Sequence, residues 1–367
     1  MPTLENARQL RLRGRHREAL GLFNALDKGD PAVLCEMAHA ALHVDAAVAE
    51  KLARAALSRA PALALANHHL GEALARQGRF DEAVVPLRAA VAIDGTLAEL
   101  LARGGKPWSH RFDVARCSHC GAAEATPVWV GNTSRSQRCL GHIDPVKVWA
   151  RCDRCGLTRV PEPPPVDHLV AYYDALRAAD GEVGAPEVGG LFDELIRWDE
   201  VMQRILALTA PGPLLEIGSA WGSFCAVAGY HGFDAVGLET APNPVAWSRE
   251  VLGVRSVEGT APDDLPDGPF QVIALWEVIE HFADPGAVLH ALRERLAPGG
   301  ILALSTPCLD HPLHRARGYD DPMWSVPGHL VYFDRATLEQ SLAAAGFAIR
   351  QRWLSPRHLG SVVVLAS

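Results

Sequence analysis

The chain of 367 residues is 49% hydrophobic and 21% charged, which is enough for two or three domains with buried cores. Its formal net charge of −8 argues against an extended nucleic-acid surface, which needs a basic face to displace counterions. The N-terminus has no apolar signal core, and no apolar run is as long as a membrane span. We therefore expect a cytoplasmic protein that contacts no membrane. In that compartment its eight cysteines should be thiols or metal ligands rather than disulfides.

Residues 1–103 are rich in Ala, Leu, Arg and Glu, which predicts helices. Four residues recur at an offset of 64: Gly14, Arg15, Glu18 and Ala19 return as Gly78, Arg79, Glu82 and Ala83. Since this offset is close to two periods of about 34 residues, the segment resembles three degenerate tetratricopeptide repeats, of which the third is the clearest. Small side chains at Gly71, Ala83 and Ala90 would let paired helices approach closely. The alternative is a generic helical bundle, and either one indicates docking or dimerisation rather than catalysis.

Residues 104–165 contain two Cys-x-x-Cys-Gly knuckles, formed by Cys117, Cys120, Cys152 and Cys155. Each knuckle places two thiolates on one side of a tight loop, and the glycine that follows can adopt a positive φ. Two knuckles complete a tetrahedral shell of four thiolates, which structural zinc prefers. Because a closed site has no open position, this zinc should hold the structure and take no part in the chemistry.

The knuckles are separated by 31 residues, which include two β-prone stretches at 128–130 and 146–149. This spacing predicts that a hairpin or loop is inserted between them. Cys139 and His142 lie in the insert and are alternative metal ligands. A disulfide pair or redox thiols are the other interpretations of the knuckles. A proline-rich stretch, 161–165, then forms a stiff linker, and residues 166–189 complete the connection with a helix that carries Tyr172 and Tyr173.

Residues 190–367 alternate between strands and helices, which predicts an α/β fold with a mostly parallel sheet covered on both faces. The expected strands are 213–217, 234–238, 254–258, 270–275, 300–305, 347–353 and 360–366. A long connection, 307–333, should form a lid or a substrate wall, because long loops in compact domains are usually functional.

A glycine-rich loop follows the first of these strands. The strand ends in Glu216, the loop runs from Gly218 to Gly222, and a second apolar run ends in Glu239 seventeen residues later. Glycine lets the backbone pass close under a ligand, and a carboxylate at the next strand end can accept two hydrogen bonds from a ribose diol. The loop lacks the full G-x-G-x-x-G run of a dinucleotide fold. The pattern predicts a nucleoside site at the end of the sheet.

The later motifs extend this pattern. Residues 270–281 read FQVIALWEVIEH, and a Pro-Gly-Gly turn at 298–300 precedes ILALSTP. In order and spacing, residues 190–367 resemble class I S-adenosylmethionine-dependent methyltransferases. The resemblance implies a Rossmann-like seven-stranded methyltransferase sheet with an antiparallel last strand. Gln271 stands where the family usually has Asp, at a position that supports a strand end rather than the chemistry.

The resemblance also implies a donor site. Gly218 and Gly222 should cradle the methionine and ribose, Glu239 should hold the ribose hydroxyls, and Thr260 and Ala261 should approach the adenine. The remaining residues expected beyond the strand ends are Glu216, Ala220, Trp276 and Glu277. Two alternatives stay open: Glu216 caps backbone amides of the loop, and Glu239 is a solvated carboxylate.

Two histidines are candidates for a general base, because an imidazole can take a proton near neutral pH. His281 ends the EVIEH motif, and His329 belongs to a Gly-His-Leu-Val-Tyr-Phe element that resembles one in the same subgroup. The alternative for His281 is a hydrogen bond to a neighbouring loop. We expect Trp324 and Tyr332 to form apolar wall, and Cys225 and Cys308 to be packed thiols.

The order of knuckles, proline-rich joint, Tyr-Tyr helix and nucleoside fold resembles zinc-bearing methyltransferases that act on sugars, secondary metabolites and related small substrates. We therefore predict methyl transfer to an O, N or C atom of a small or carrier-held acceptor, with the repeats binding a protein partner or a second copy. One alternative is a protein or RNA acceptor docked by the N-terminal modules. RNA is opposed by the acidic charge and by the lack of an Asn-Pro-Pro-aromatic tetrad. Another is a non-catalytic scaffold with a vestigial nucleoside site.

Overall fold

The computed structural model describes residues 3–93, 116–133, 143–180, 188–356, 358 and 360–367. These residues form two compact units. The helical unit holds the described residues of Met1–Asp113, Thr126–Ala150 and Tyr319–Pro327, and the sheet unit holds those of Val114–Ala125, Arg151–Gly318 and Gly328–Ser367. This division cuts across the predicted segments 1–103, 104–165, 166–189 and 190–367, because the cysteine knuckles belong to one unit and most of the insert between them to the other.

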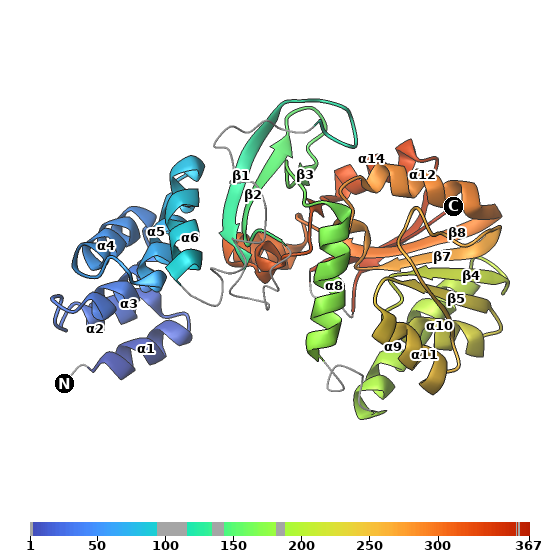
Figure 1. The fold of residues 1–367 in the computed structure, drawn as a ribbon, viewed down its shortest axis with the longest axis horizontal. Helices are drawn as coiled ribbons and strands as arrows, with labels where there is room; N and C mark the ends of the chain where they lie inside the picture. Colours follow the sequence, from blue (N-terminus) through green and yellow to red (C-terminus); the bar gives the residue numbers. More distant parts are fainter. Residues whose placement is uncertain (1–2, 94–115, 134–142, 181–187, 357, 359) are drawn as a thin grey trace. The chain divides into compact units, whose positions relative to one another are not determined.

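The helical unit begins with six helices, as the composition predicts. They are α1 (Leu4–Leu12), α2 (His16–Phe23), α3 (Pro31–Leu42), α4 (Ala46–Arg59), α5 (Ala64–Arg76) and α6 (Phe80–Ile93), drawn in blue in Figure 1. Consecutive helices pack against each other as hairpins. Asp30 and Asp45 begin α3 and α4 by accepting hydrogen bonds from the first free backbone N–H groups.

The 64-residue sequence echo corresponds to a repeated local structure. Gly14 and Gly78 have φ of +73° and +75° in the turns after α1 and α5, a conformation that favours glycine. Arg15 then pairs with Glu18, and Arg79 pairs with Glu82. The first and third hairpins therefore share one turn and one ion pair, while their assignment to the tetratricopeptide family remains a prediction.

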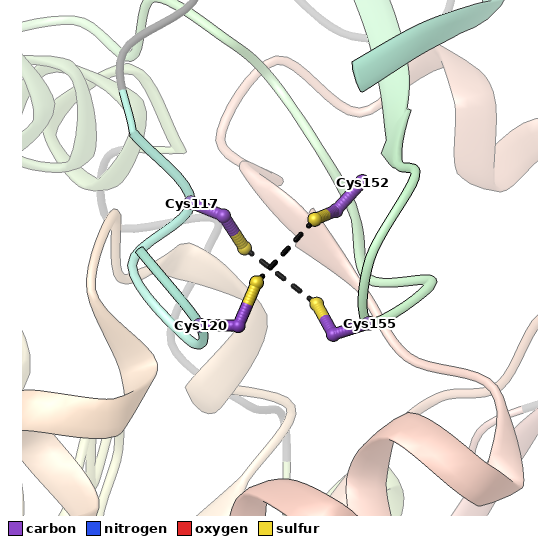
Figure 2. Close-up of side chains that lie close together, drawn as sticks. All are labelled: Cys117, Cys120, Cys152 and Cys155. Carbon is purple, nitrogen blue, oxygen red and sulfur yellow. Dashed lines mark hydrogen bonds between the residues drawn. The ribbon is translucent and has the colours of Figure 1, made fainter. Parts of the chain in front are cut away.

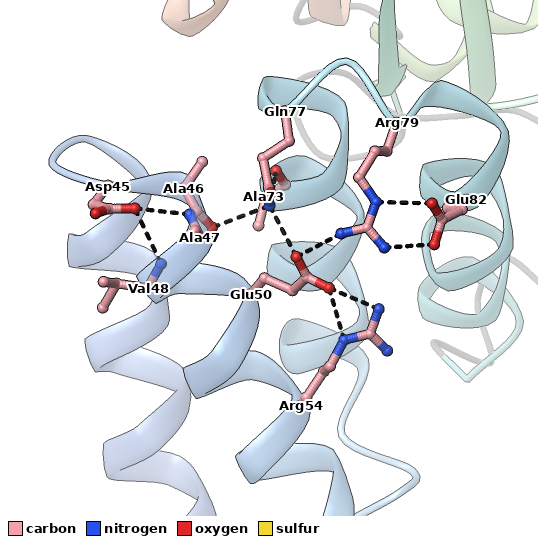
Figure 3. A network of polar contacts seen from close by, with 10 residues as sticks. All are labelled: Asp45, Ala46, Ala47, Val48, Glu50, Arg54, Ala73, Gln77, Arg79 and Glu82. Carbon is pink, nitrogen blue, oxygen red and sulfur yellow. Dashed lines mark hydrogen bonds and ion pairs between the residues drawn. The ribbon is translucent and has the colours of Figure 1, made fainter.

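A polar network joins the last three helices of this set (Figure 3). Glu50 of α4 accepts hydrogen bonds from Arg54, from Gln77 after α5 and from Arg79 before α6. The Arg79 guanidinium thus holds Glu50 with one nitrogen while its other nitrogens hold Glu82. This network fixes the second hairpin against the third.

Gly71 allows the close approach of α5 and α6 that the sequence predicts. A Cβ at Gly71 would lie 2.4 Å from Leu87 Cγ and 3.1 Å from the Ala83 carbonyl oxygen. We therefore expect Gly71→Ala to destabilise the helical unit by about 1–3 kcal/mol through overpacking. Gly21 in α2 is the matched control, because nothing lies within 4 Å of its added Cβ; Gly21→Ala should stabilise by about 0.5–1 kcal/mol. Urea unfolding followed by circular dichroism measures both, and shifts of the same sign would contradict the close contact.

The helical unit also contains most of the insert between the knuckles. Strands β1 (Ala125–Asn132) and β2 (Val146–Cys152) are neighbours and contain the two stretches predicted as β. Trp129 stacks on Tyr319 at 4.2 Å between ring centroids, and Trp149 meets Trp324 edge-on at 5.7 Å. Trp324 therefore packs among aromatic rings of the helical unit and does not line the cleft of the sheet unit, where we expected it to form a wall. The predicted lid, 307–333, is divided between the two units, because its middle packs on these rings.

The sheet unit has the predicted seven-stranded sheet. Its strands are β4 (Pro213–Ile217), β5 (Asp234–Glu239), β6 (Arg255–Glu258), β7 (Phe270–Trp276), β8 (Leu296–Pro307), β10 (Ile349–Leu354) and β11 (Ser361–Ala366). They lie in the order β10-β11-β8-β7-β4-β5-β6. Strands β4 to β8 pair in parallel, and β11 is antiparallel to both of its neighbours, which confirms the antiparallel last strand. Gln271 donates to Thr209 Oγ1 near the start of β7, in keeping with a structural role.

Helices cover both faces of this sheet. The helices of the sheet unit are α8 (Val166–Asp180), α9 (Val188–Leu206), α10 (Ser223–Tyr230), α11 (Pro242–Val251), α12 (Pro285–Arg295), α13 (Pro312–Arg317) and α14 (Arg335–Ala344). Figure 1 shows α12 and α14 on one face and α9, α10 and α11 on the other. A short antiparallel pair, β3 (Thr158–Arg159) with β9 (Val331–Tyr332), completes the unit. Of the helices in the described ranges, none is long and apolar enough to cross a bilayer.

Candidate active site

A cleft of about 680 Å³ lies in the sheet unit beyond the carboxyl ends of β4, β5 and β7. It is lined by these predicted donor-site residues: Glu216, Gly218, Ala220, Glu239, Thr260, Ala261, Trp276 and Glu277. Of the two candidate bases, His281 lines the cleft and His329 does not. The sequence thus identified the strand ends at which ligands of open α/β sheets bind.

The glycine loop has the backbone conformation that its sequence predicts. Gly218 has a φ of +67°, and a Cβ there would lie 2.6 Å from Val278 Cγ2. Gly222, with a φ of +78°, forms the N-cap of α10, where a Cβ would lie 2.9 Å from Ser248 Cβ. Gly222 is not part of the cleft wall, so its contribution is the turn into the helix and the packing against Ser248.

Glu239 joins the loop to the next strand. Its side chain is buried, with Oε2 accepting from the Ala220 backbone N–H at 2.8 Å and Oε1 from that of Ala241 at 3.1 Å. An ionised carboxylate offers about four lone-pair sites, so these bonds leave acceptor capacity for a ligand in the cleft. The structure therefore gives Glu239 a fixed orientation rather than that of a solvated carboxylate.

Glu216 is buried at the end of β4, where Oε2 accepts a hydrogen bond from the Cys225 thiol at 3.1 Å. Burial raises the pKa of Cys225 well above its usual range, and the charge of Glu216 raises it further. Burial also raises the pKa of Cys308, to about 12, with Asp310 adding to the shift. Both cysteines are packed thiols, as expected.

The EVIEH motif places two buried carboxyl groups in different electrostatic environments. Burial by itself would raise the pKa of Glu277. Hydrogen bonds and charge from His358, with hydrogen bonds from Ser305 and Ser361, have a larger opposite effect, so this pKa is lower than its ordinary value. Burial raises the pKa of Glu280 well above its usual range, and the charge of Glu277 adds to this. The pKa values of the two carboxyl groups are therefore shifted in opposite directions.

His281 is held by two groups from distant parts of the chain. Its Nδ1 lies 2.9 Å from the Gly328 carbonyl oxygen and 2.6 Å from the Tyr173 hydroxyl of α8. A carbonyl oxygen can only accept, so we assign the proton to Nδ1, where the Gly328 carbonyl and the Tyr173 hydroxyl oxygen both accept it, and the lone pair to Nε2. His281 thus bonds to a neighbouring loop, as the alternative supposed, and this same bond gives it the tautomer of a base.

Gly328 and Tyr173 were not predicted as site residues. A Cβ at Gly328 would lie 1.9 Å from the Tyr173 hydroxyl oxygen, so only glycine allows this contact. The available signals were the Tyr-Tyr helix and the glycine before His329. His329 itself lies 4.7 Å from His281 between ring centroids, with Nδ1 3.0 Å from the Tyr332 hydroxyl. It is an edge neighbour of the base candidate rather than part of the cleft wall.

Thr260 and Ala261 follow β6 at the adenine end of the predicted donor site. The backbone N–H and the hydroxyl of Thr260 both donate to Asp264 Oδ2, at 2.9 and 3.0 Å. These two bonds fix the turn that forms this part of the cleft wall.

The four knuckle thiols converge in the sheet unit (Figure 2). Cys117 Sγ lies 3.7 Å from Cys155 Sγ, and Cys120 Sγ lies 3.5 Å from Cys152 Sγ. Two sulfurs around one tetrahedral zinc, with bonds of about 2.3 Å, are about 3.8 Å apart. A disulfide needs about 2.05 Å, so these sulfurs are free thiols with spacings that fit a single zinc ion.

The knuckle backbone favours a thiolate at Cys152, whereas burial raises the pKa of Cys117 and of Cys155. Gly121 and Gly156 have φ of +72° and +82°, as predicted. Burial by itself would raise the pKa of Cys152. Hydrogen bonds from the backbone N–H groups of Cys155 and Arg154 have a larger opposite effect, and the pKa of this thiol is lowered to about 7. The alternative ligands Cys139 and His142 lie outside the described residues.

Comparisons with known proteins agree with the fold. Residues 193–352 match the family model described as a methyltransferase domain. The chain is 36% identical over 126 residues to a ubiquinone biosynthesis O-methyltransferase of Cereibacter sphaeroides, covering 30% of this chain and 51% of that protein. It is 34% identical over 100 residues to the enzyme of the same name from Azorhizobium caulinodans, covering 25% and 39%.

The chain thus spans about half the length or less of these curated relatives. A solved structure, the mitomycin 7-O-methyltransferase, is similar at 17% identity and a TM-score of 0.40, covering 47% of this chain and 53% of that one, a likeness too remote to carry an argument. Residues 193–352 thus match a methyltransferase domain by sequence, and this part of the chain forms the seven-stranded sheet that the resemblance to class I S-adenosylmethionine-dependent methyltransferases implies.

Proposed function

We propose that this chain is an enzyme that transfers the methyl group of S-adenosylmethionine to an O, N or C atom of a small or carrier-held organic acceptor, with a hydroxyl oxygen favoured. The observation that carries the proposal is one cleft that combines the glycine loop, Glu239 and an imidazole, His281, with its lone pair on Nε2. The curated relatives are named O-methyltransferases, which also favours oxygen.

Each part of the cleft has a separate task in this proposal. Bound S-adenosylmethionine supplies a methyl group that its positive sulfonium has already activated for in-line displacement. Glu239 binds the ribose hydroxyls, and the backbone at Gly218 and Ala220 lies against the rest of the donor. His281 Nε2 takes the proton of the acceptor, while the Gly328 carbonyl holds its ring in position.

The acceptor side of the cleft indicates its substrate class. Val166, Leu169, Val170 and Tyr173 of α8 line the cleft with the i, i+3, i+4, i+7 spacing of one helix face. Apolar side chains exclude water and bind an apolar body, so a hydroxylated secondary metabolite suits this wall better than a bare sugar.

The donor site is tested by calorimetry with S-adenosylhomocysteine. We expect Glu239→Ala to weaken binding by roughly 1.5–3 kcal/mol, the range for hydrogen bonds to a charged group. Glu258→Ala is the matched control, because Glu258 pairs with Glu239 in the sheet register, is exposed and does not line the cleft. Equal affinity in both variants would remove Glu239 from the site, and a wild-type chain that does not bind would sink the proposed function.

We also propose that the four knuckle thiols hold one structural zinc ion, and that the helical hairpins are tetratricopeptide-like repeats that dock a partner or a second copy. Large apolar side chains on these helices are exposed, among them Leu12 (68%), Val85 (58%) and Leu65 (45%). We expect the full chain to be a dimer, and light scattering at micromolar concentration checks this. A monomer would leave docking as the role of the repeats.

A further inference from the structure

Five imidazoles gather where α2, α3 and α5 meet in the helical unit. Consecutive rings are in contact in the order His16, His43, His39, His69 and His68, with centroid distances of 4.0, 6.0, 4.8 and 5.6 Å. Nothing in the proposed methyl transfer uses them. Histidine is the commonest protein ligand of transition metals, so a cluster of imidazoles is a natural place for a metal site.

One carboxylate oxygen faces two of these rings. Glu72 Oε2 lies 3.5 Å from His68 Nε2 and 3.8 Å from His69 Nδ1, and the three ligand atoms are within 4.8 Å of one another. Both distances are longer than those of ordinary direct hydrogen bonds. Ligand atoms around one tetrahedral zinc, with bonds of about 2.0–2.1 Å, are about 3.4 Å apart. Small side-chain rotations would therefore bring all three atoms onto a single ion.

Burial supports this interpretation. His69 is only 3% exposed, and its Nδ1 has no hydrogen-bond partner among the described residues, although an unpaired buried nitrogen is unfavourable. Glu72 faces both rings with one carboxylate oxygen, which is a suitable ligand atom for the same ion. A metal ion would satisfy the buried nitrogen and the carboxylate together.

The surrounding charges leave room for a cation. Arg76 Nη1 approaches the other oxygen of Glu72 at 3.9 Å, while Nη2 binds Asp320, which also accepts from His43. The guanidinium is therefore shared between two carboxylates. Burial lowers the pKa of His39 to about 3, with His69 and Arg11 adding to the shift, so this ring is neutral. Arg11 donates to His39 Nδ1, which leaves the proton on Nε2 and makes His39 a neighbour rather than a ligand.

We propose that His68, His69 and Glu72 form a binding site for a divalent first-row transition-metal ion of the zinc type, separate from the four thiols. Two imidazole nitrogens and one carboxylate oxygen suit Zn²⁺, Co²⁺, Ni²⁺ or Cu²⁺, with water in the fourth position. Mg²⁺ and Ca²⁺ are disfavoured because they take oxygen ligands.

The test is a Co²⁺ titration of the full chain, followed by visible absorption. Cobalt in a nitrogen and oxygen site gives d–d bands without the sulfur-to-cobalt charge transfer that thiolates produce, so the spectrum separates this site from the knuckles. We expect one such ion per chain. His69→Gln should lower the affinity of this site for Co²⁺ by more than the roughly 10–100-fold that follows from the loss of a residue that only hydrogen-bonds to a metal ligand. His290→Gln, on the exposed surface of α12, is the matched control and should bind as the wild type does.

Glu72→Gln is the second variant, because Glu72 is about a quarter exposed (26%) and its replacement leaves both buried rings in place. It should lose the ion while the helical circular dichroism stays unchanged. Two results would overturn the proposal. One is a wild-type spectrum in which all cobalt bands have sulfur character, and the other is an equal affinity for Co²⁺ in the wild type and in Glu72→Gln.

Discussion

Replacing His281 with Ala should lower kcat by roughly 10²–10⁴-fold while binding of S-adenosylhomocysteine persists. The reason is the tautomer that the Gly328 carbonyl sets, which puts the lone pair of the ring on Nε2 in a residue that lines the cleft. Single-turnover measurements with saturating donor and a hydroxylated acceptor report the chemical step directly.

His329→Ala is the matched control for this experiment. His329 is an imidazole 4.7 Å from His281 between ring centroids, yet it does not line the cleft. Its loss should change kcat far less than the loss of His281, through the packing of the neighbouring ring alone. A larger loss in His329→Ala would reassign the base. Near-normal turnover in both variants would mean that the acceptor needs no protein base, as with an amine that arrives neutral.

The sheet could be predicted from the sequence because its signals are local. Each expected strand is an apolar run bounded by turn residues, and six of them are found within two residues of their predicted limits. Strand β8 is the exception, since it begins at Leu296 rather than at residue 300. Its register is irregular beside the Pro-Gly-Gly turn, where Phe270 pairs with Leu296 and Val272 with Ile301. A Pro-Gly-Gly turn in a sequence predicts a loop. That the residues around it belong to a strand is decided by their pairing with β7, which the sequence does not show.

The donor site could be predicted for the same reason, since its residues sit at strand ends that the motifs mark. The two residues that hold the proposed base, His281, could not be predicted in this way. Tyr173, His281 and Gly328 come from three segments separated by 108 and 47 residues, and no periodicity links them. The histidine cluster was also missed, because His16, His39 and His69 lie on three different helices. Likewise, the division of the 307–333 connection between two units depends on the Trp129–Tyr319 and Trp149–Trp324 contacts, which are long-range.

Replacing Cys152 with Ser should remove the zinc that we propose for the knuckles, since a serine hydroxyl is not a zinc ligand in such sites. Structural zinc contributes about 10–16 kcal/mol of apparent binding free energy in zinc-finger peptides, and this free energy is folding free energy. Elemental analysis of protein purified without added metal should give about one zinc per chain more in the wild type than in Cys152→Ser, because the site proposed at His68, His69 and Glu72 is the same in both proteins. Cys308→Ser is the matched control, because it is an equally buried thiol outside the cluster whose hydrogen bond to Asp310 a serine can keep.

The loss of zinc should also be local. The two knuckles are joined by the Asp153 N–H bond to the Glu124 carbonyl, and each is closed by a glycine N–H bond to Cys117 O or Cys152 O. Without the ion these amides should exchange with deuterium much faster, while amides between β4 and β5 keep the protection of the sheet ladder. Full zinc content in Cys152→Ser would instead point to Cys139 or His142 as the fourth ligand. Absence of zinc from the wild-type chain, with the same amides protected, would mean that hydrogen bonds alone hold the knuckles together.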